Sequence, residues 1–147
     1  MIRAVLDVNV LVSALLSPRG VPARILDLWR EEAFVVVTSE AMLATLEQVL
    51  SRRAFARKYG LTARHRTALV RGLRRFALVT RGACEVSGVA PDAEDDAVLA
   101  CAVEGEADYV VTGDRGLLAI EAYEGIPILV PTSFVEALAE QERADRT

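Results

Sequence analysis

The acidic residues of this sequence lie where they could do chemistry together. Asp7 directly follows an apolar run at residues 2–6, and Asp114 follows a second run at residues 109–112. Between them, four acids fall within five residues: Asp92, Glu94, Asp95 and Asp96. Clustered carboxylates without His or Cys suit a hard, oxygen-preferring cation such as Mg²⁺ or Mn²⁺. The chemistry that fits such a cluster is metal-assisted attack of water on a phosphodiester bond.

Each acid could also have a purely structural role. Asp7 could cap a following helix, Asp114 could stabilise a turn, and acids at residues 92–96 favour a helix N-terminus. Such roles are adequate for Glu94 and for one or two of its neighbours. They are less adequate for Asp7, because a carboxylate that ends an apolar strand loses solvation unless it has a partner or a metal. Independent turns and caps also need not gather at one end of one sheet.

The elements that position these acids are predicted by apolar runs that alternate with helical patterns. This alternation is typical of an α/β domain with a mostly parallel sheet. Five strands are expected at residues 2–6, 34–38, 84–86, 109–112 and 126–130, with the last at a sheet edge because it contains Pro127. Helices are expected at residues 22–30, 39–51, 62–76, 93–104, 116–123 and 133–142, with N-caps at Ser39, Thr62, and Thr132 or Ser133.

Length and composition restrict the class of protein. A chain of 147 residues with 52% hydrophobic residues is expected to form one ordered domain over residues 1–147, with a frayed tail at residues 141–147. No apolar run reaches the roughly 18 residues of a membrane span, and no signal-peptide pattern follows the first run, so we expect a cytoplasmic protein with no membrane partner. Cys84 and Cys101 lack the CxxC spacing of zinc or redox sites and are expected to be ordinary thiols.

Three acidic motifs resemble those of the PIN-domain nucleases, in particular the VapC-like toxins of toxin-antitoxin pairs. Residues 6–15 are similar to the opening motif of that family, residues 92–100 to its second acidic block, and residues 110–118 to its third. Residues 125–129 resemble its last strand, and the order of the motifs agrees. The resemblance implies a compact α/β/α sandwich with the activity of a Mg²⁺- or Mn²⁺-dependent endoribonuclease. It also implies a small antitoxin protein as partner and a homodimer.

The resemblance further implies roles for single residues. Asp7 and Asp114 would be catalytic metal ligands, and the acid at the helix start would be Asp95 or Asp96, since either register aligns. The supporting residues would be Asn9, Thr112 and Asp92, with Asn9 and Thr112 positioning ligands or water.

The sequence departs from the family pattern at Thr45. PIN domains normally have a glutamate there, on the helix after the second strand. Glu47 lies two residues further on, which is about 200° around a helix, so we expect it to point elsewhere. An alternative therefore stays open, in which the chain is a catalytically impaired PIN-type module that binds RNA or a partner protein without cleaving.

Positive charge is concentrated in one segment. Residues 49–83 contain no Asp or Glu and carry ten of the 17 positive charges, so this segment has a charge of +10 against −14 elsewhere. Such asymmetry indicates a polyanion on one side of the molecule and cations on the other. Two alternatives stay open: the arginines coat the outer faces of helices, or they receive an acidic antitoxin tail. The residues expected to contact RNA are Arg52, Arg53, Arg57, Lys58, Arg74 and Arg75.

Overall fold

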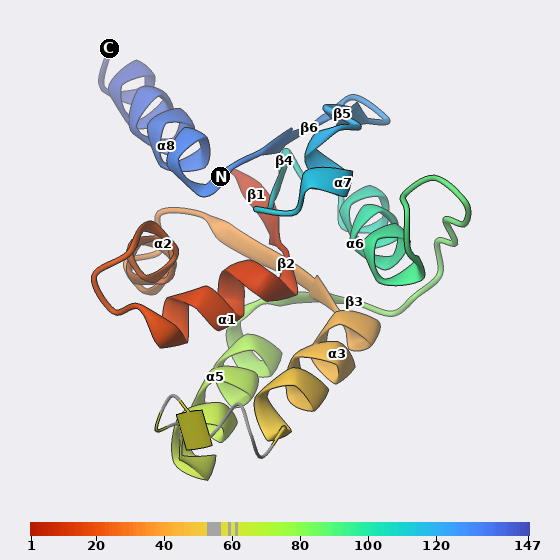
Figure 1. The fold of residues 1–147 in the computed structure, drawn as a ribbon. Coiled ribbons are helices and arrows are strands. Elements are labelled where there is room, and N and C mark those ends of the chain that lie inside the picture. The colour runs from red at the N-terminus through yellow and green to blue at the C-terminus, as the bar shows by residue number, and fades with distance from the viewer. Residues whose placement is uncertain (53–56, 59, 61) are drawn as a thin grey trace.

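The computed structural model describes residues 1–52, 57–58, 60 and 62–147 and has a central sheet with helices around it (Figure 1). The strands follow the order β3-β2-β1-β4-β6-β5 across the sheet, and every neighbouring pair is parallel except β5 with β6. The predicted α/β class with a mostly parallel sheet is confirmed. The strands are β1 (Arg3–Leu6), β2 (Val35–Ser39), β3 (Leu78–Thr80), β4 (Tyr109–Val111), β5 (Ala122–Tyr123) and β6 (Ile126–Leu129).

The helices flank this sheet. Helix α6 packs on β1, β2 and β4, helix α5 packs on β2 and β3, and helix α8 packs on β4 and α2 (Figure 1). Ser39 and Thr62 cap α3 and α5 as predicted, each accepting a backbone N–H of the first turn. The helices described in full are α1 (Val8–Leu16), α2 (Val21–Arg30), α3 (Glu40–Ser51), α5 (Ala63–Phe76), α6 (Ala93–Glu104), α7 (Arg115–Leu118) and α8 (Pro131–Arg146).

The strands are apolar because helices cover them. Residues 4–6 of β1 are fully buried, as are residues 36 and 37 of β2. Phe134 of α8 packs edge-to-face on Phe34 and Tyr109, with ring centroids 5.0 and 6.0 Å apart. These contacts attach the last helix near the amino-terminal ends of the strands and leave their carboxyl ends to the acidic residues.

Three predictions about the sheet are wrong. The third strand is Leu78–Thr80 rather than residues 84–86, where the backbone N–H of Cys84 bonds to the carboxylate of Glu104 instead of to a strand. The sheet has six strands rather than five, because Ala122–Tyr123 pairs with β6. The strand that contains Pro127 therefore lies between two neighbours and not at the edge.

Three helices also differ from the predictions. Helix α1 was not expected, because Val8–Leu16 is apolar nearly throughout and has no polar face. Helix α7 ends at Leu118 rather than residue 123, since β5 follows it. Helix α8 begins with Pro131 at its first position, so its N-cap is Val130 and neither Thr132 nor Ser133. It continues through residue 146, and residues 141–146, expected to fray, are helical.

Candidate active site

A row of polar residues lies along the carboxyl ends of four neighbouring strands, β3, β2, β1 and β4. Ser39 pairs with Thr80 in the register of β2 and β3. The registers of β1 with β2 and with β4, continued by one or two residues, place Asp7 level with Ser39 on one side and with Thr112 on the other. The Thr112 hydroxyl donates a hydrogen bond of 2.7 Å to Oδ2 of Asp7. The sheet therefore fixes where this carboxylate lies.

Asp7 is buried, with 5% of its surface exposed. It occupies the N-cap position of α1, but its side chain makes no capping hydrogen bond. Burial raises the pKa of Asp7 and the nearby charge of Asp114 raises it further, while the hydrogen bond from Thr112 and the backbone N–H groups of Val8 and Asn9 act in the opposite direction. The largest compensation for the burial of Asp7 therefore comes from Thr112 across the sheet and not from the start of α1.

Asp114 begins helix α7, just beyond the end of β4. Its Oδ2 accepts the backbone N–H of Leu117 at 2.9 Å, and its own N–H donates to the Thr112 hydroxyl at 2.9 Å. The cap uses one carboxylate oxygen and leaves the other for a further contact. Gly116 keeps this turn close to the preceding loop, since an added Cβ would lie 2.9 Å from Cγ of Pro91 and 3.0 Å from Oδ2 of Asp114.

Asp95 and Asp96 are both buried, but they face different groups. Burial raises the pKa of Asp95 to about 7, and the negative charges of Asp114, Asp92 and Asp7 add to the effect. The carboxylate of Asp96 instead accepts the backbone N–H groups of Gly88, Val89 and Ala90 at 2.9, 3.2 and 2.7 Å. Asp95 thus lies within electrostatic reach of Asp7 and Asp114, whereas Asp96 holds a loop. Asp92 caps α6 by accepting the N–H of Asp95 at 2.9 Å.

The chemistry of this group of side chains fits an oxygen-preferring cation. Asp7, Asp95 and Asp114 offer only carboxylate oxygens, and no salt bridge among the described residues joins them to a basic side chain. Their negative charge is therefore not compensated, which agrees with the raised pKa values of Asp7 and Asp95. Within the same residues, no three His, Cys, Asp or Glu side chains are grouped closely enough to hold a metal ion. As they lie in the structure, the three carboxylates do not form a complete set of metal ligands.

Two further residues of the predicted site contribute differently. Asn9 is exposed on the first turn of α1, and its backbone N–H rather than its side chain acts on Asp7. Thr45 is half-buried on α3, and its hydroxyl donates to the carbonyl of Ala41 at 3.2 Å. The position that holds a glutamate in the family pattern therefore has a hydroxyl whose hydrogen bond is made within its own helix.

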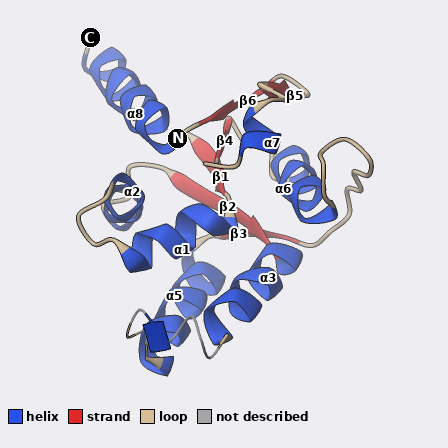
Figure 2. Ribbon diagram, viewed as in Figure 1, coloured by secondary structure: helices blue, strands red, loops and turns tan. Residues whose placement is uncertain are grey.

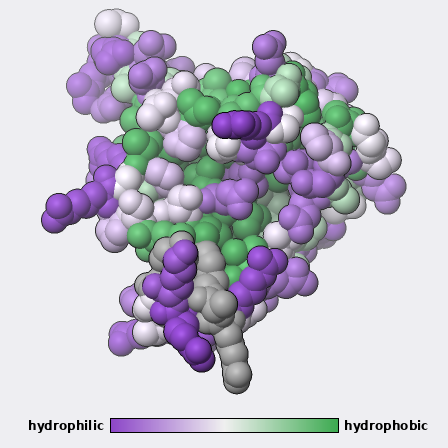
Figure 3. Space-filling model, in the orientation of Figure 1, coloured by the Kyte–Doolittle hydropathy of each residue, from purple (hydrophilic) through white to green (hydrophobic). Residues whose placement is uncertain are grey.

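Five of the six residues expected to contact RNA lie in the described part of the basic segment. Arg52, Arg57, Lys58 and Arg75 are exposed, while Arg53 falls outside the residues that the structure describes. Long hydrophilic side chains project where α3 ends and α5 begins (Figure 3). Arg74 is engaged within the protein, since its Nη1 donates to both carboxylate oxygens of Glu40 at 2.9 Å.

None of the helices in the described part of the chain combines the length and apolarity needed to cross a membrane.

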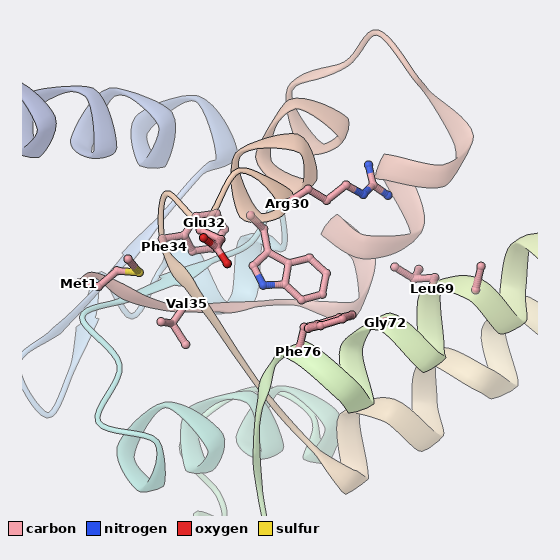
Figure 4. A pocket seen from close by; sticks show the side chains of 10 residues that line it. Met1, Arg30, Glu32, Phe34, Val35, Leu69, Gly72 and Phe76 are labelled. Carbon is pink, nitrogen blue, oxygen red and sulfur yellow. The ribbon is translucent and has the colours of Figure 1, made fainter.

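A large apolar groove lies elsewhere in the molecule. It has a volume of about 690 Å³ and is bounded by α2, the start of β2 and α5 (Figure 4). Phe76, at the end of α5, is 68% exposed beside it, and Met1 and Val35 also line it. These residues precede the strands, whereas Asp7 and Asp114 follow them. The groove is therefore not part of the acidic site.

Sequence reasoning missed the role of Glu104. Its carboxylate accepts the backbone N–H groups of Arg81 and Cys84 at 2.8 and 3.1 Å, and these bonds lower its pKa. An acid in the last turn opposes the helix dipole, and this is the one signal in the sequence that the side chain has another partner. Glu104 and Asp96 together fasten the loop between β3 and α6, which is the long tan segment beside α6 in Figure 2.

The Thr112 hydroxyl is expected to be needed for a firmly placed Asp7. Thr112→Val keeps the shape of the side chain but removes both hydrogen bonds, so we expect a loss of stability of about 1–3 kcal/mol and metal affinity lowered about 10–100-fold. Thermal unfolding and Mn²⁺ titration measure the two effects. Thr112→Ser, which keeps the hydroxyl, is the control and should bind Mn²⁺ nearly as well as the native chain. Equal Mn²⁺ affinity in the valine variant would contradict the prediction.

Comparison with known proteins shows which family the chain is similar to. A family model described as "PIN domain" matches residues 3–116, a stretch that contains Asp7, Asp95 and Asp114. The uncharacterized protein MJ1680 of Methanocaldococcus jannaschii is 30% identical over 120 residues, which are 81% of this chain and 75% of that protein. PIN domains are generally nucleases, which indicates a nuclease-type function. The chain belongs to the PIN domain family.

Proposed function

We propose that this chain is a metal-dependent endoribonuclease that hydrolyses RNA phosphodiester bonds, with Mg²⁺ or Mn²⁺ held by Asp7, Asp95 and Asp114. The observation that carries the proposal is the nearness of these three acids, two of them buried, with no basic partner among the described residues. Such crowding costs stability unless a cation compensates it. Active sites commonly contain charged groups arranged in this costly way.

The residues around the acids have distinct parts in this proposal. Asp7, Asp95 and Asp114 would hold the ion, which when bound would supply charge stabilisation for the phosphate and activation of a water molecule. Thr112 fixes the orientation of the Asp7 carboxylate, and Asp92 caps the helix that carries Asp95. Asp95, whose pKa is about 7, gives up its proton readily near neutral pH when a cation approaches. Asp96 acts on the loop and not on the substrate.

RNA is the substrate that the charge distribution favours. Arg52, Arg57, Lys58 and Arg75 are exposed and can contact the phosphate backbone, an interaction that weakens as salt concentration rises. We expect Arg53 to contact the phosphate backbone as well. Arg74 would have to leave Glu40 before it could contribute.

The role of toxin in a toxin-antitoxin pair is part of the same proposal. Its support is the resemblance of residues 6–15 and 110–118 to the VapC-like motifs. A small antitoxin partner and a homodimer belong to this proposal and have the same support. A cytoplasmic location is also proposed, and its support is the lack of a signal-peptide pattern after the first apolar run.

Thr45 favours a second candidate function, that of a PIN-type module that binds RNA or a partner protein without cleaving it. The family glutamate would supply a further carboxylate at this position, and the hydroxyl of Thr45 is already bonded to Ala41. A weaker metal site follows if no other acid replaces that glutamate.

Cleavage of a mixed single-stranded RNA decides between the two functions. We expect the native chain to cleave RNA with Mg²⁺ or Mn²⁺ and not in the presence of EDTA. The Asp7→Asn variant should cleave about three orders of magnitude more slowly, which is roughly 4 kcal/mol of activation free energy. Asp27→Asn is the matched control, because Asp27 is an exposed acid on α2 whose one ion pair within the described residues is with Arg30. No cleavage by the native chain, or cleavage that survives in Asp7→Asn, would favour the binding module.

A further inference from the structure

A second cavity adjoins the acidic site on the other side of α6. It has a volume of about 390 Å³, which is in the range of about 300–1,000 Å³ that small-ligand pockets have. Small side chains of α6 leave it open, and the loop after β3 forms its outer wall. We call it the α6 pocket, lined by Ser39, Glu40, Ala41, Thr80, Arg81, Gly82, Cys84, Glu85, Val86, Ser87, Ala93, Ala97, Ala100, Cys101 and Glu104.

The register of the sheet gives the distance from this pocket to the acids. Ser39 lies one strand away from Asp7, and Thr80 lies one strand further on the same level. Since neighbouring strands are about 4.8 Å apart, the backbone of Ser39 lies about 5 Å from that of Asp7, and the backbone of Thr80 lies about 10 Å from it. This is the span of a single nucleotide between its phosphate and the far edge of its base.

The pocket is held open by backbone contacts. Glu104 accepts the N–H groups of Arg81 and Cys84, and Asp96 accepts those of Gly88, Val89 and Ala90. The two acids lie on one helix, and the loop wall is fastened to that helix at both of its ends. A ligand therefore does not have to order the wall when it binds, which lowers the entropic cost of binding.

One hydroxyl in the pocket has no partner. Thr80 is 6% exposed, and its Oγ1 makes no hydrogen bond within the part of the chain that the structure describes, although it lies beside the thiol of Cys101. Burial raises the pKa of Cys101 to about 12, so that thiol stays neutral. A buried unpartnered hydroxyl costs stability. At the floor of a pocket it can donate to, or accept from, the polar edge of a ligand.

We propose that the α6 pocket binds one nucleobase of a single-stranded RNA whose backbone lies at Asp7, Asp95 and Asp114. Single-stranded RNA is read by pockets that take an unstacked base and bond to its edges. The alanines of α6 and Val86 offer apolar contact to the base faces, and Thr80 offers the polar contact at its edge. The inference rests on the proposed function for the identity of the strand, but the base-binding property of the pocket can be tested without cleavage.

The experiment uses uncharged nucleosides as probes, so that the acids do not repel them, and EDTA, so that nothing is cut. Adenosine, guanosine, cytidine and uridine are titrated into the isotope-labelled full chain, with ribose as the base-free control. We expect amide shifts at residues 81–87 and 97–101 with at least one nucleoside and none with ribose. A single-stranded RNA hexamer is expected to shift the same amides, which distinguishes a site for bases within RNA from a site for free nucleosides.

Two valine substitutions provide a matched pair. Thr80 and Thr38 both have buried hydroxyl groups without a hydrogen-bond partner among the described residues, but only Thr80 lines the α6 pocket. Both variants should fold with equal or higher thermal stability. Thr80→Val is expected to weaken nucleoside binding about tenfold, whereas Thr38→Val leaves it unchanged. Ala97→Phe fills the pocket and should abolish binding, while Ala44→Phe at an exposed position of α3 should not.

The outcomes separate this inference from the proposed function. Nucleoside binding that is lost in Ala97→Phe supports the pocket whether or not the native chain cuts RNA. Shifts confined to other parts of the molecule, equal binding by the two valine variants, or binding of nucleosides but not of the hexamer would overturn the inference. Cleavage without any base binding at these residues would leave the nuclease intact and refute the pocket.

Discussion

Asp95→Asn is expected to abolish RNA cleavage while making the metal-free protein more stable. The carboxylate of Asp95 is buried among Asp7, Asp92 and Asp114, so removing its charge relieves repulsion and desolvation. We expect a gain of about 1–2 kcal/mol in the free energy of unfolding at pH 8. We expect a loss of about three orders of magnitude in cleavage rate, because a proposed metal ligand is gone. Thermal unfolding in EDTA and the RNA cleavage assay measure the two effects.

Asp96→Asn should have the opposite effect on stability. Its carboxylate accepts three backbone N–H groups of residues 88–90, and an amide supplies only one acceptor oxygen, so we expect a loss of about 2–3 kcal/mol. Some cleavage should remain at a temperature where the variant is folded. Asp95→Asn and Asp96→Asn therefore control for each other, because the first should lose cleavage and gain stability, and the second should lose stability and keep some cleavage. Full loss of cleavage in folded Asp96→Asn together with an active Asp95→Asn would reverse the roles that we assign.

The pH dependence of stability gives a further measurement on Asp95. Its pKa is raised from an ordinary value near 4 to about 7 in the folded protein, so folding favours the protonated form. Its contribution to stability is therefore highest below pH 4 and is lost as the pH rises from 4 to 7. Native protein in EDTA should lose stability across this window, and Asp95→Asn should lose less. Saturating Mn²⁺ should reduce the loss, since a cation stabilises the charged form.

Thr45→Glu is expected to raise both metal affinity and cleavage rate by at least about tenfold. The substitution restores the carboxylate of the family pattern on α3, and additional oxygen ligands strengthen binding of Mg²⁺ or Mn²⁺. Glutamate is also the better residue in a helix interior, so α3 itself should tolerate it. The metal-free variant should be less stable, because we expect the added carboxylate to repel the charges of Asp7 and Asp95. Mn²⁺ titration, cleavage rate and thermal unfolding with and without metal test these effects.

Thr45→Gln is the control, since it has the same shape without the charge. It should not raise metal affinity. If Thr45→Glu and Thr45→Gln behave alike, the position does not reach the site and the missing glutamate is irrelevant to activity. If the native chain is inactive and Thr45→Glu is active, the binding module is the better description of the native protein.

The sequence predicted the long buried strands well, and it predicted two short strands and helix α1 poorly. Strands β1, β2, β4 and β6 are apolar runs that helices bury, and burial leaves a clear signal in composition. Leu78–Thr80 is too short for such a signal, and Ala122–Tyr123 is a strand only because it pairs with β6. Helix α1 has no polar face because it is packed on several sides, and an apolar run of this kind does not distinguish a helix from a strand.

Asp7 and Asp114 were predicted as site residues from their places after strands, and Asp95 or Asp96 from a place at a helix start, but their orientations could not be predicted. Asp95 and Asp96 are neighbours in sequence, and neighbours on a helix point about 100° apart. Which of them faces Asp7 depends on where α6 begins, and that is set by the cap at Asp92. The motif alone allowed either register. Thr80 and Glu104 had no recognisable pattern, because their roles depend on contacts with a loop and a neighbouring strand.

The hydrogen bond between Thr112 and Asp7 joins residues 105 positions apart, and this separation affects the kinetics of folding. Contacts of such separation form late, because the chain must first lose the entropy of closing a long loop. The acidic group therefore exists only once β1 and β4 have paired. A ligand of that group should leave the folding rate nearly unchanged and slow unfolding. Mn²⁺ would therefore stabilise the folded protein kinetically without assisting its folding.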